Sequence, residues 1–248
     1  MVAGVGSGLG SAVVSLLASA GATTLAVARR EGSLAQLREL AKSRGWNFRG
    51  MTADLAQASE VRGLLDAVTG EFGPLDGLSV NAGHWVEGSP FLHQSTDEEW
   101  TRGLADNLDP LFYLCRAALP PMIARGRGAI VLVSASDRVR VLGTPSYDAA
   151  KGAIVELTTK LAHDYRPSGI RVNAVLPGTM EHDVDLANPP TPGTPLALLD
   201  KSGSGAWEVA RAILFLLSEE ARWVSGAALR VDGGYSTHGK EPSAAPPK

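Results

Sequence analysis

The sequence predicts a single α/β domain, a doubly wound, Rossmann-type parallel sheet of about seven strands with helices on both faces. Two observations lead to this prediction. Apolar runs of strand length alternate with helix-period patterns along most of the 248 residues. A glycine-rich turn also lies between the first of these strands and the first helix. In folds of this kind, ligands bind at the carboxyl ends of the strands.

The expected strands are short apolar runs bounded by polar residues or glycine. In chain order they are Met1–Ala3, Thr23–Ala28, Trp46–Met51, Leu75–Val80, Ala129–Ser134, Ile170–Val175 and Ala227–Val231. The first helix is expected over Leu9–Ser19. Ser33 and Ser59 are expected to cap the next two helices, because a serine hydroxyl can accept a hydrogen bond from the first turn.

The second half of the chain carries longer helices. Thr96 and Glu99 form a capping-box pattern that begins a long helix over 97–124. Further helices are expected over Pro145–Arg166 and Ala206–Ser218. Together these elements predict one domain over residues 1–236.

Two segments interrupt the alternation of strands and helices. Asn188–Gly205 is rich in Pro, Gly and Ser, and we expect it to form a mobile lid. Thr237–Lys248 has the composition of a disordered tail.

Composition excludes several classes of protein. The formal net charge of −3 does not suit a general phosphate-binding surface, so we expect no nucleic-acid partner. No apolar run reaches the ~18 residues that a membrane span needs, and the N-terminus lacks the basic start of a signal peptide. The single cysteine, Cys115, lies in an apolar run, so we expect a core residue. These features predict a cytoplasmic protein without a membrane partner.

The glycines at 4, 6, 8 and 10 predict a phosphate-binding loop. The common G-x-G-x-x-G/A pattern fits neither register, whereas G-x-x-x-G-x-G fits Gly4, Gly8 and Gly10. Such glycines allow a tight turn and let backbone N–H groups approach a pyrophosphate at a helix N-terminus. The alternative is a loop that is merely flexible.

Tyr147 and Lys151 stand four residues apart at the start of a predicted helix, so they share one face. A nearby ammonium stabilises a phenolate, and we expect Lys151 to lower the pKa of Tyr147 toward neutrality. Taken alone, this spacing more often marks an ordinary surface pair.

With its other motifs, the chain resembles the short-chain dehydrogenase/reductase family over residues 1–236. The resemblance implies an oxidoreductase that transfers hydride between a nicotinamide cofactor and the carbonyl or secondary alcohol of a small molecule. The motifs follow the family's order and approximate spacing: the glycine loop, Asp54, Asn81-Ala82-Gly83, Asn107, Ser134, Tyr147, Lys151, Pro177-Gly178 and Val231-Asp232-Gly233-Gly234.

The resemblance implies catalytic roles for four residues. Tyr147 would be the general acid/base, and Lys151 would lower its pKa and bind the nicotinamide ribose. Ser134 would hydrogen-bond the substrate oxygen. Asn107, expected in the middle of a helix, would hold a water with its backbone in a proton relay to Lys151.

The identity of the serine stays open between two positions. The family's usual spacing selects Ser134, thirteen residues before Tyr147. Counting from the start of the strand places Ala135 there instead, so one residue is missing somewhere. Ser136 is the alternative.

The resemblance also implies cofactor contacts at the carboxyl ends of the strands. Asp54 would meet the adenine, the segment from Asn81 would line the adenosine, and the segment from Pro177 would run beside the nicotinamide. The full set is Gly4, Ser7, Gly8, Leu9, Gly10, Arg29, Arg30, Asp54, Leu55, Asn81, Ala82, Gly83, Tyr147, Lys151, Pro177, Gly178, Thr179 and Met180. For Asp54 the alternative is a cap on the approach to a helix.

The end of the second strand favours NADP(H) over NAD(H). NAD enzymes usually carry an acidic residue there, which binds the ribose 2′-hydroxyl, whereas arginine accommodates a 2′-phosphate. Here Ala28 takes the acidic position, and Arg29 and Arg30 follow it. A guanidinium binds phosphate through two parallel hydrogen bonds.

Two further expectations concern substrate and assembly. His84 and Trp85 could border the substrate, although His84 is more simply a loop residue. The resemblance suggests a homodimer or homotetramer that uses apolar strips on the helices at 97–124 and 145–166. These strips include Leu111, Leu114, Leu157 and Leu161. The short first strand and Ala3, where the family commonly has threonine, leave room for a weakened enzyme or a truncated start. The alternative function is a cofactor-binding protein with little or no activity; the open identity of the serine argues for it, and the intact Tyr147 and Lys151 pair argues against it.

Overall fold

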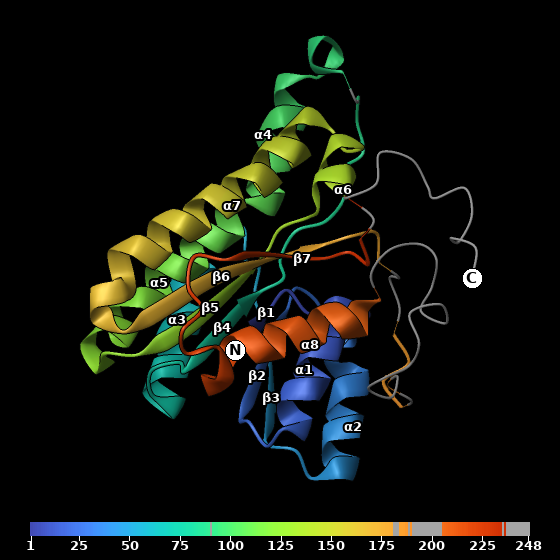
Figure 1. The fold of residues 1–248 in the computed structure, drawn as a ribbon. Coiled ribbons are helices and arrows are strands. Elements are labelled where there is room, and N and C mark those ends of the chain that lie inside the picture. Colours follow the sequence, from blue (N-terminus) through green and yellow to red (C-terminus); the bar gives the residue numbers. More distant parts are fainter. Residues whose placement is uncertain (90, 181–183, 188, 190–204, 235, 237–248) are drawn as a thin grey trace, which may run out of the picture.

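A computed structural model of the chain describes residues 1–89, 91–180, 184–187, 189, 205–234 and 236. In these residues, seven strands form one sheet in the order β3-β2-β1-β4-β5-β6-β7, and every neighbouring pair is parallel (Figure 1). This confirms the doubly wound Rossmann-type prediction. The lid expected over Asn188–Gly205 lies outside the described residues except at its positions 189 and 205, and the tail from Thr237 lies wholly outside them.

The strands are short and mostly buried. β2 is buried at every position, as expected of a parallel strand that helices cover on both faces. β1 lies between β2 and β4, so the direction of the strand order changes there and the sheet has its switch point beside β1. The bounds are β1 Val2–Ala3, β2 Thr24–Ala28, β3 Phe48–Thr52, β4 Gly77–Val80, β5 Gly128–Val133, β6 Ile170–Pro177 and β7 Ala228–Val231.

Helices cover both faces of the sheet (Figure 1). α3, α5 and α7 pack over one face, and α1, α2 and α8 lie over the other. The α-helices are α1 Leu9–Ser19, α2 Ala35–Arg44, α3 Ala58–Phe72, α4 Asp97–Asn107, α5 Asp109–Arg125, α6 Asp137–Val141, α7 Pro145–Tyr165 and α8 Ala206–Leu217. Short 3-10 helices lie at η1 Glu31–Leu34, η2 Leu92–Gln94, η3 Arg166–Ser168 and η5 Glu219–Ala221.

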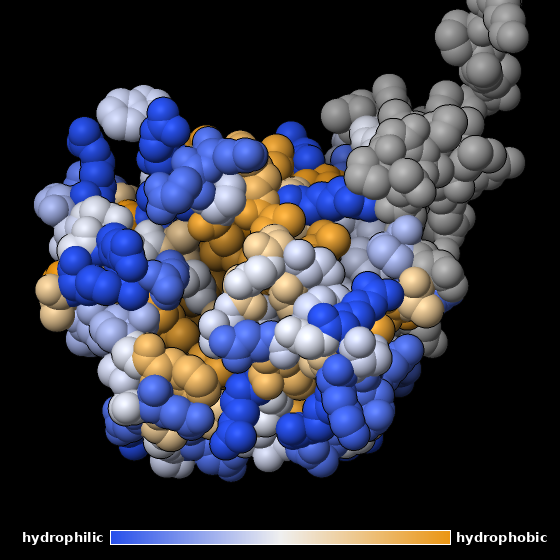
Figure 2. All heavy atoms as spheres, turned by 90° about the horizontal axis from the view of Figure 1, so that it is seen from below, coloured by the Kyte–Doolittle hydropathy of each residue, from blue (hydrophilic) through white to orange (hydrophobic). Residues whose placement is uncertain are grey.

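Two hydrophobic cores lie on opposite faces of the sheet, and alternate residues of the central strand β5 belong to one or the other. On β5, Ile130 and Leu132 face α5 and α7, whereas Val131 and Val133 face α8. Cys115 is buried in the first of these cores, and burial raises the pKa of its thiol to about 12. This cysteine is therefore a core residue, as the sequence predicts. Seen from below, the molecule presents mostly hydrophilic residues with hydrophobic ones showing between them (Figure 2).

The long helix predicted over 97–124 is wrong, because the structure divides it at Leu108 into α4 and α5. Pro110 lacks an N–H and cannot bond the carbonyl of Asp106, so α5 starts anew with a proline in its first turn. The capping box at the start of α4 is confirmed, with Glu99 N 3.1 Å from the Thr96 hydroxyl.

The caps predicted at Ser33 and Ser59 are also wrong. Ser33 lies inside the 3-10 helix η1, and Ser59 lies within the first turn of α3, which starts after Gln57. The approach to α3 uses carboxylates instead, because Asp54 N donates to Glu60 Oε2 at 2.8 Å. α6 was not predicted, since a five-residue helix is too short to show a 3.6-residue period.

The apolar strips proposed for assembly are partly wrong. Leu111 and Leu114 are buried in the core of the chain itself, and the neighbouring Phe112 is 50% exposed. No described helix combines the length and the apolar composition that a membrane crossing requires.

Candidate active site

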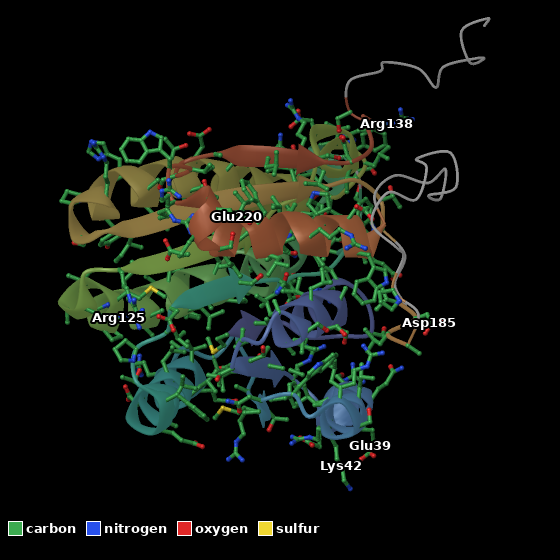
Figure 3. All side chains as sticks on the ribbon, turned by 60° about the horizontal axis from the view of Figure 1, so that its bottom comes forward. Glu39, Lys42, Arg125, Arg138, Asp185 and Glu220 are labelled. Atoms are coloured by element: carbon green, nitrogen blue, oxygen red, sulfur yellow. The ribbon has the colours of Figure 1, made fainter. Side chains whose placement is uncertain are left out.

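The motif residues follow the carboxyl ends of six strands. Gly4 follows β1, Arg29 follows β2, and Asp54, Asn81, Ser134 and Gly178 follow β3 to β6. Because the strands are parallel, these residues gather at one edge of the sheet. Figure 3 shows Arg138, after β5, and Asp185, after β6, toward this edge, and Arg125 toward the opposite one.

The glycine loop packs directly against the segment that follows β4. Gly4 has φ +89°, and a Cβ there would lie 2.5 Å from Ala82 N. A Cβ on Gly10 would lie 2.7 Å from the carbonyl oxygen of Gly4. Gly8 precedes α1, and no side chain caps this helix. Because the N-cap residue Gly8 has no side chain, it leaves the N-terminus of α1 uncapped, which suits a pyrophosphate.

The end of β2 presents two arginines. Ala28 is buried, and Arg29 and Arg30 are exposed. Within the described part of the chain, neither guanidinium has an ion-pair partner, whereas Arg38 pairs with Glu31 at 2.8 Å.

The residues after β3 and β4 are held by local hydrogen bonds. Asp54 Oδ1 accepts from Ala56 N at 3.1 Å, so its carboxylate caps the approach to α3, and Leu55 is buried. Asn81 N donates to Ala3 O at 2.8 Å, and its amide Nδ2 lies 3.2 Å from the Ser79 hydroxyl.

Tyr147 and Lys151 lie on the buried face of α7. Lys151 Nζ is 5.8 Å from the centroid of the Tyr147 ring and donates to Val133 O at 3.3 Å. A Cβ on Gly83 would lie 2.9 Å from Lys151 Nζ and 2.7 Å from Asn107 Oδ1. The fold therefore brings Gly83, Asn107, Tyr147 and Lys151 together from three separate elements.

Burial shifts the pKa values of both groups. It raises the pKa of Tyr147 to about 12 and lowers the pKa of Lys151 to about 8. The expected lowering of the Tyr147 pKa is therefore wrong for this chain without a cofactor. Loss of water around the phenol outweighs the nearby amine, and that amine's own charge is weakened by burial.

Asn107 lies at the end of α4 and not in the middle of a helix. Its amide Nδ2 donates to Gly103 O at 3.2 Å, and its Oδ1 accepts from His84 N at 3.0 Å. The side chain therefore holds the segment that follows β4. Its main-chain carbonyl lies in the last turn of α4, where carbonyl groups lack a regular helical partner.

Ser134 and Ser136 differ in their surroundings. The Ser134 hydroxyl donates to the main-chain carbonyl of Lys151 at 2.6 Å. Ser136 is fully buried, and its hydroxyl has no hydrogen-bond partner among the described residues. Ser136 N donates to the carbonyl of Pro177, which ends β6. Thr179 beyond it is exposed, and Met180 packs against the core beneath α1 and α8.

Two residues contact the Tyr147 ring from outside the motifs. The Trp85 ring lies 5.2 Å from it, centroid to centroid, and Trp85 is 47% exposed. A Cβ on Gly143 would lie 2.6 Å from Tyr147 Cδ1. The exposed Val141 and Leu142 precede this glycine. Sequence reasoning named Trp85 only as a neighbour of the substrate, and nothing in the residue pattern singled out Gly143.

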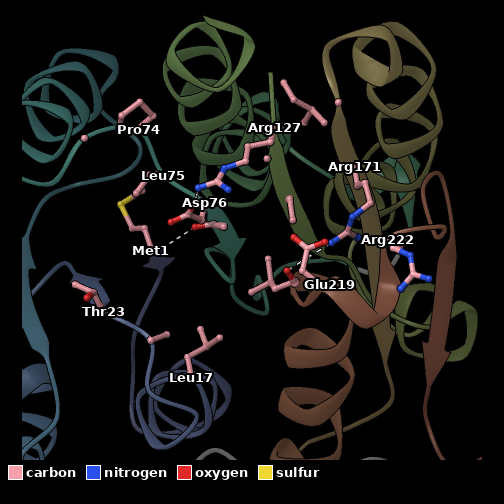
Figure 4. Close-up of a pocket in the computed structure, with 18 of the residues that line it drawn as sticks. Met1, Leu17, Thr23, Pro74, Leu75, Asp76, Arg127, Arg171, Glu219 and Arg222 are labelled. Carbon is pink, nitrogen blue, oxygen red and sulfur yellow. Dashed lines mark hydrogen bonds and ion pairs between the residues drawn. The ribbon is translucent and has the colours of Figure 1, made fainter. Parts of the chain in front are cut away.

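A cavity of about 1070 Å³ lies at the opposite edge, where β1, β2, β4, β5 and β6 begin (Figure 4). Asp76 and Arg127 form an ion pair at 3.1 Å on its wall. This cavity is separated from Tyr147 by the length of the strands. Among the described residues, no group of three or more His, Cys, Asp or Glu could hold a metal ion.

A family model described as enoyl-(acyl carrier protein) reductase matches residues 4–236, which include every motif of the site. The chain belongs to the short-chain dehydrogenase/reductase family. This short-chain dehydrogenase/reductase is 33% identical to 2-(S)-hydroxypropyl-CoM dehydrogenase 3 of Xanthobacter autotrophicus, over 95% of each chain. It is 37% identical to cis-4-hydroxycyclohexanecarboxylate dehydrogenase of Sinomonas cyclohexanicum, again over 95% of each chain.

Solved structures agree with these relatives. A gluconate 5-dehydrogenase from Burkholderia cenocepacia, in complex with NADP and tartrate, superposes with a TM-score of 0.79. It is 28% identical, and the match covers 95% of this chain and 94% of that one. The short-chain dehydrogenase/reductase described here is thus an oxidoreductase of a family that binds NAD or NADP.

Proposed function

We propose that the chain interconverts a small-molecule carbonyl and its secondary alcohol, prefers NADP(H), and uses Tyr147 as general acid/base. The observation that carries this proposal is the meeting of Tyr147, Lys151, Asn107 and Gly83 at the carboxyl edge of the sheet. The glycine loop packs against the segment that holds Gly83. A reacting group beside Tyr147 is therefore within reach of a cofactor bound on that loop.

The residues of this edge fit a dinucleotide. Gly4 and Gly10 leave no room for side chains, so the loop is packed tightly against Ala82 and against its own first turn. Gly8, before α1, has no side chain that would keep the backbone away from a bound phosphate. The N-terminus of α1, where the N-cap residue Gly8 has no side chain, would bind the pyrophosphate. When bound, the cofactor supplies or accepts the hydride.

Reduction then requires one proton at the carbonyl oxygen. The Tyr147 hydroxyl donates it as hydride adds to the carbonyl carbon, which leaves a secondary alcohol and a phenolate. The Lys151 ammonium stabilises the phenolate. The carbonyl of Asn107 would hold the water through which a proton returns. A hydroxyl from Ser134 or Ser136 would fix the substrate oxygen.

The preference for NADP(H) is supported by Arg29 and Arg30. Both follow β2 and are exposed, and within the described residues no carboxylate neutralises them. A 2′-phosphate would supply the missing negative charge. The NADP complex of the Burkholderia gluconate 5-dehydrogenase shows that a similar fold accepts this cofactor.

The residues around Tyr147 indicate a class of substrate. Trp85, Val141 and Leu142 are exposed apolar residues on the two segments that touch Tyr147, so they suit a substrate with a hydrocarbon part. The alcohol named for the Sinomonas relative is of this kind.

A cytoplasmic location is part of the same proposal. The lone buried Cys115 is compatible with a reducing cytoplasm.

The experiment that tests this function replaces Tyr147 by Phe. NADPH should bind nearly as in the wild type, and kcat should fall by on the order of a hundredfold, because only the proton donor is lost. The assay follows NADPH oxidation with a panel of small ketones and NADP reduction with cis-4-hydroxycyclohexanecarboxylate. Unimpaired reduction by the variant would refute the assignment. NADPH binding without turnover in the wild type would favour a non-catalytic cofactor-binding protein.

A further inference from the structure

We propose that Ser136, and not the Ser134 that sequence spacing selects, supplies the hydroxyl that holds the substrate oxygen beside Tyr147. This inference rests on the proposed function and assigns one more residue to it.

Ser134 is already engaged in the fold. Its hydroxyl donates to the main-chain carbonyl of Lys151 at 2.6 Å, and its side chain is buried. A hydroxyl has a single proton to donate. Ser134 therefore joins the end of β5 to α7, and its donor is not available to a substrate oxygen.

The same contact fixes how β5 and α7 lie against one another. Ser134 N donates to Val175 O and Ser136 N donates to Pro177 O, so extended pairing with β6 continues past the end of β5. Residues two apart in extended chain share a face, and Ser136 therefore faces α7 as Ser134 does.

The distances along the two elements also agree. From Ser134 to Ser136 the extended chain advances by about 6.6 Å toward the carboxyl edge. α7 connects two parallel strands and runs against them, so Tyr147, four residues before Lys151, lies about 6 Å toward the same edge. Ser136 is therefore expected opposite Tyr147, just as Ser134 lies opposite Lys151.

The Ser136 hydroxyl lacks a hydrogen-bond partner within the described residues, and a substrate oxygen could supply one. Ser136 is fully buried, and its oxygen has no hydrogen-bond partner among the described residues. It precedes the first residue of α6, a position where serine usually caps the helix, but its side chain makes no cap bond. Buried hydroxyl groups are nearly always hydrogen-bonded, so a partner from outside the chain is expected.

In ketone reduction, Ser136 would donate a hydrogen bond to the carbonyl oxygen while Tyr147 transfers its proton to the same atom. In the reverse direction, the alcohol gives its single proton to the Tyr147 phenolate, and the Ser136 hydroxyl again donates a hydrogen bond to the same oxygen. Ser136 itself neither gains nor loses a proton. Its main-chain bond to Pro177 keeps it next to the segment proposed for the nicotinamide.

The test compares Ser136→Ala with Ser134→Ala in the full chain. Activity is measured with NADP and cis-4-hydroxycyclohexanecarboxylate, or with NADPH and the fastest ketone of the panel. Ser136→Ala should lower kcat by on the order of a hundredfold and leave the melting temperature unchanged or higher, because it removes a buried hydroxyl without a partner. Ser134→Ala should lower the melting temperature and cost much less in kcat, because it removes a structural hydrogen bond.

A larger loss of kcat in Ser134→Ala than in Ser136→Ala would overturn the inference, as would full activity of Ser136→Ala. Tyr147→Phe, measured alongside, separates a failure of the serine assignment from a failure of the proposed function. If Tyr147→Phe loses activity and Ser136→Ala does not, only the assignment of the serine fails. If Tyr147→Phe stays active, or the wild type turns over none of these substrates, the proposed function fails and the inference fails with it.

Discussion

Burial separates the pKa values of Tyr147 and Lys151, so that the lysine loses its proton at a much lower pH than the tyrosine. The pKa of Tyr147 is about 12 and that of Lys151 about 8, because burial disfavours the charged form of each. Near neutral pH the phenol is protonated and can donate. The ammonium that would stabilise the resulting phenolate is present only below a pH of about 8.

Ketone reduction should therefore slow as the pH rises through about 8, where Lys151 loses its proton. Tyr147 remains protonated until about 12 and does not limit the rate in this range. The pH profile of kcat/KM for NADPH-dependent reduction measures this, since it reports groups of the free enzyme. Lys151→Arg keeps its positive charge at high pH. The variant should therefore be slower than the wild type, but its kcat/KM should not fall near pH 8. A flat wild-type profile through this range would contradict the prediction.

Arg29 should determine much of the cofactor preference. Arg29→Ala should weaken NADPH binding by about 10- to 150-fold, toward the low end because Arg30 can share the contact, and leave NADH binding nearly unchanged. Adding Ala28→Asp should invert the preference, since a carboxylate binds the ribose diol and repels a phosphate. Titration of both cofactors decides the matter. An equal loss for both would mean that Arg29 supports the fold instead.

At the scale of single residues, the sequence identified positions better than interactions. The resemblance picked out Tyr147, Lys151, Asn107 and Gly83, and the fold brings them together. It could not show that Ser134 bonds the backbone of α7 or that burial raises the Tyr147 pKa. The first depends on how closely β5 and α7 pack, and the second on how much water the folded chain excludes, and no spacing in the sequence records either.

In the glycine loop, the backbone geometry of Gly4 leads to a prediction about stability and cofactor binding. Gly4→Ala should weaken NADPH binding and cost about 1–3 kcal/mol of stability, because its φ is +89° and the new Cβ would lie 2.5 Å from Ala82 N. Gly6→Ala is the matched control, since its Cβ would meet nothing within 4 Å. Thermal melting and NADPH titration of both variants compare them. Equal melting temperatures would show that the loop can move away from Ala82.

Secondary structure was predictable wherever periodicity was long and uninterrupted. The strands lie within a few residues of the predicted runs, and α1, α7 and α8 agree closely. The break at Leu108 was missed because the apolar pattern continues across it, and only the absent N–H of Pro110 interrupts the helix. α6 offered too few residues for any period to appear.

At the scale of the whole molecule, assembly remains a prediction. The exposed Phe112 and Ile123 lie on α5, and the half-exposed Trp100 lies on α4. These apolar side chains should be covered in a homodimer or homotetramer. Light scattering at micromolar concentration should then give a multiple of 25.9 kDa, and Phe112→Asp should shift it toward the single chain. A wild-type mass of 25.9 kDa would contradict the prediction.

The contact between Trp85 and Tyr147 also gives the molecule an optical property. An indole whose centroid lies 5.2 Å from the tyrosine ring shares the environment of the proposed chemistry. Reduced nicotinamide absorbs light at the wavelengths where tryptophan emits, so energy transfer would quench Trp85 when the cofactor arrives. Trp223, 96% exposed and on the wall of the distant cavity, would be quenched much less. Trp85 would then serve as an intrinsic fluorescent reporter of cofactor binding, and titration of NADPH into the wild type and into Trp85→Phe measures it.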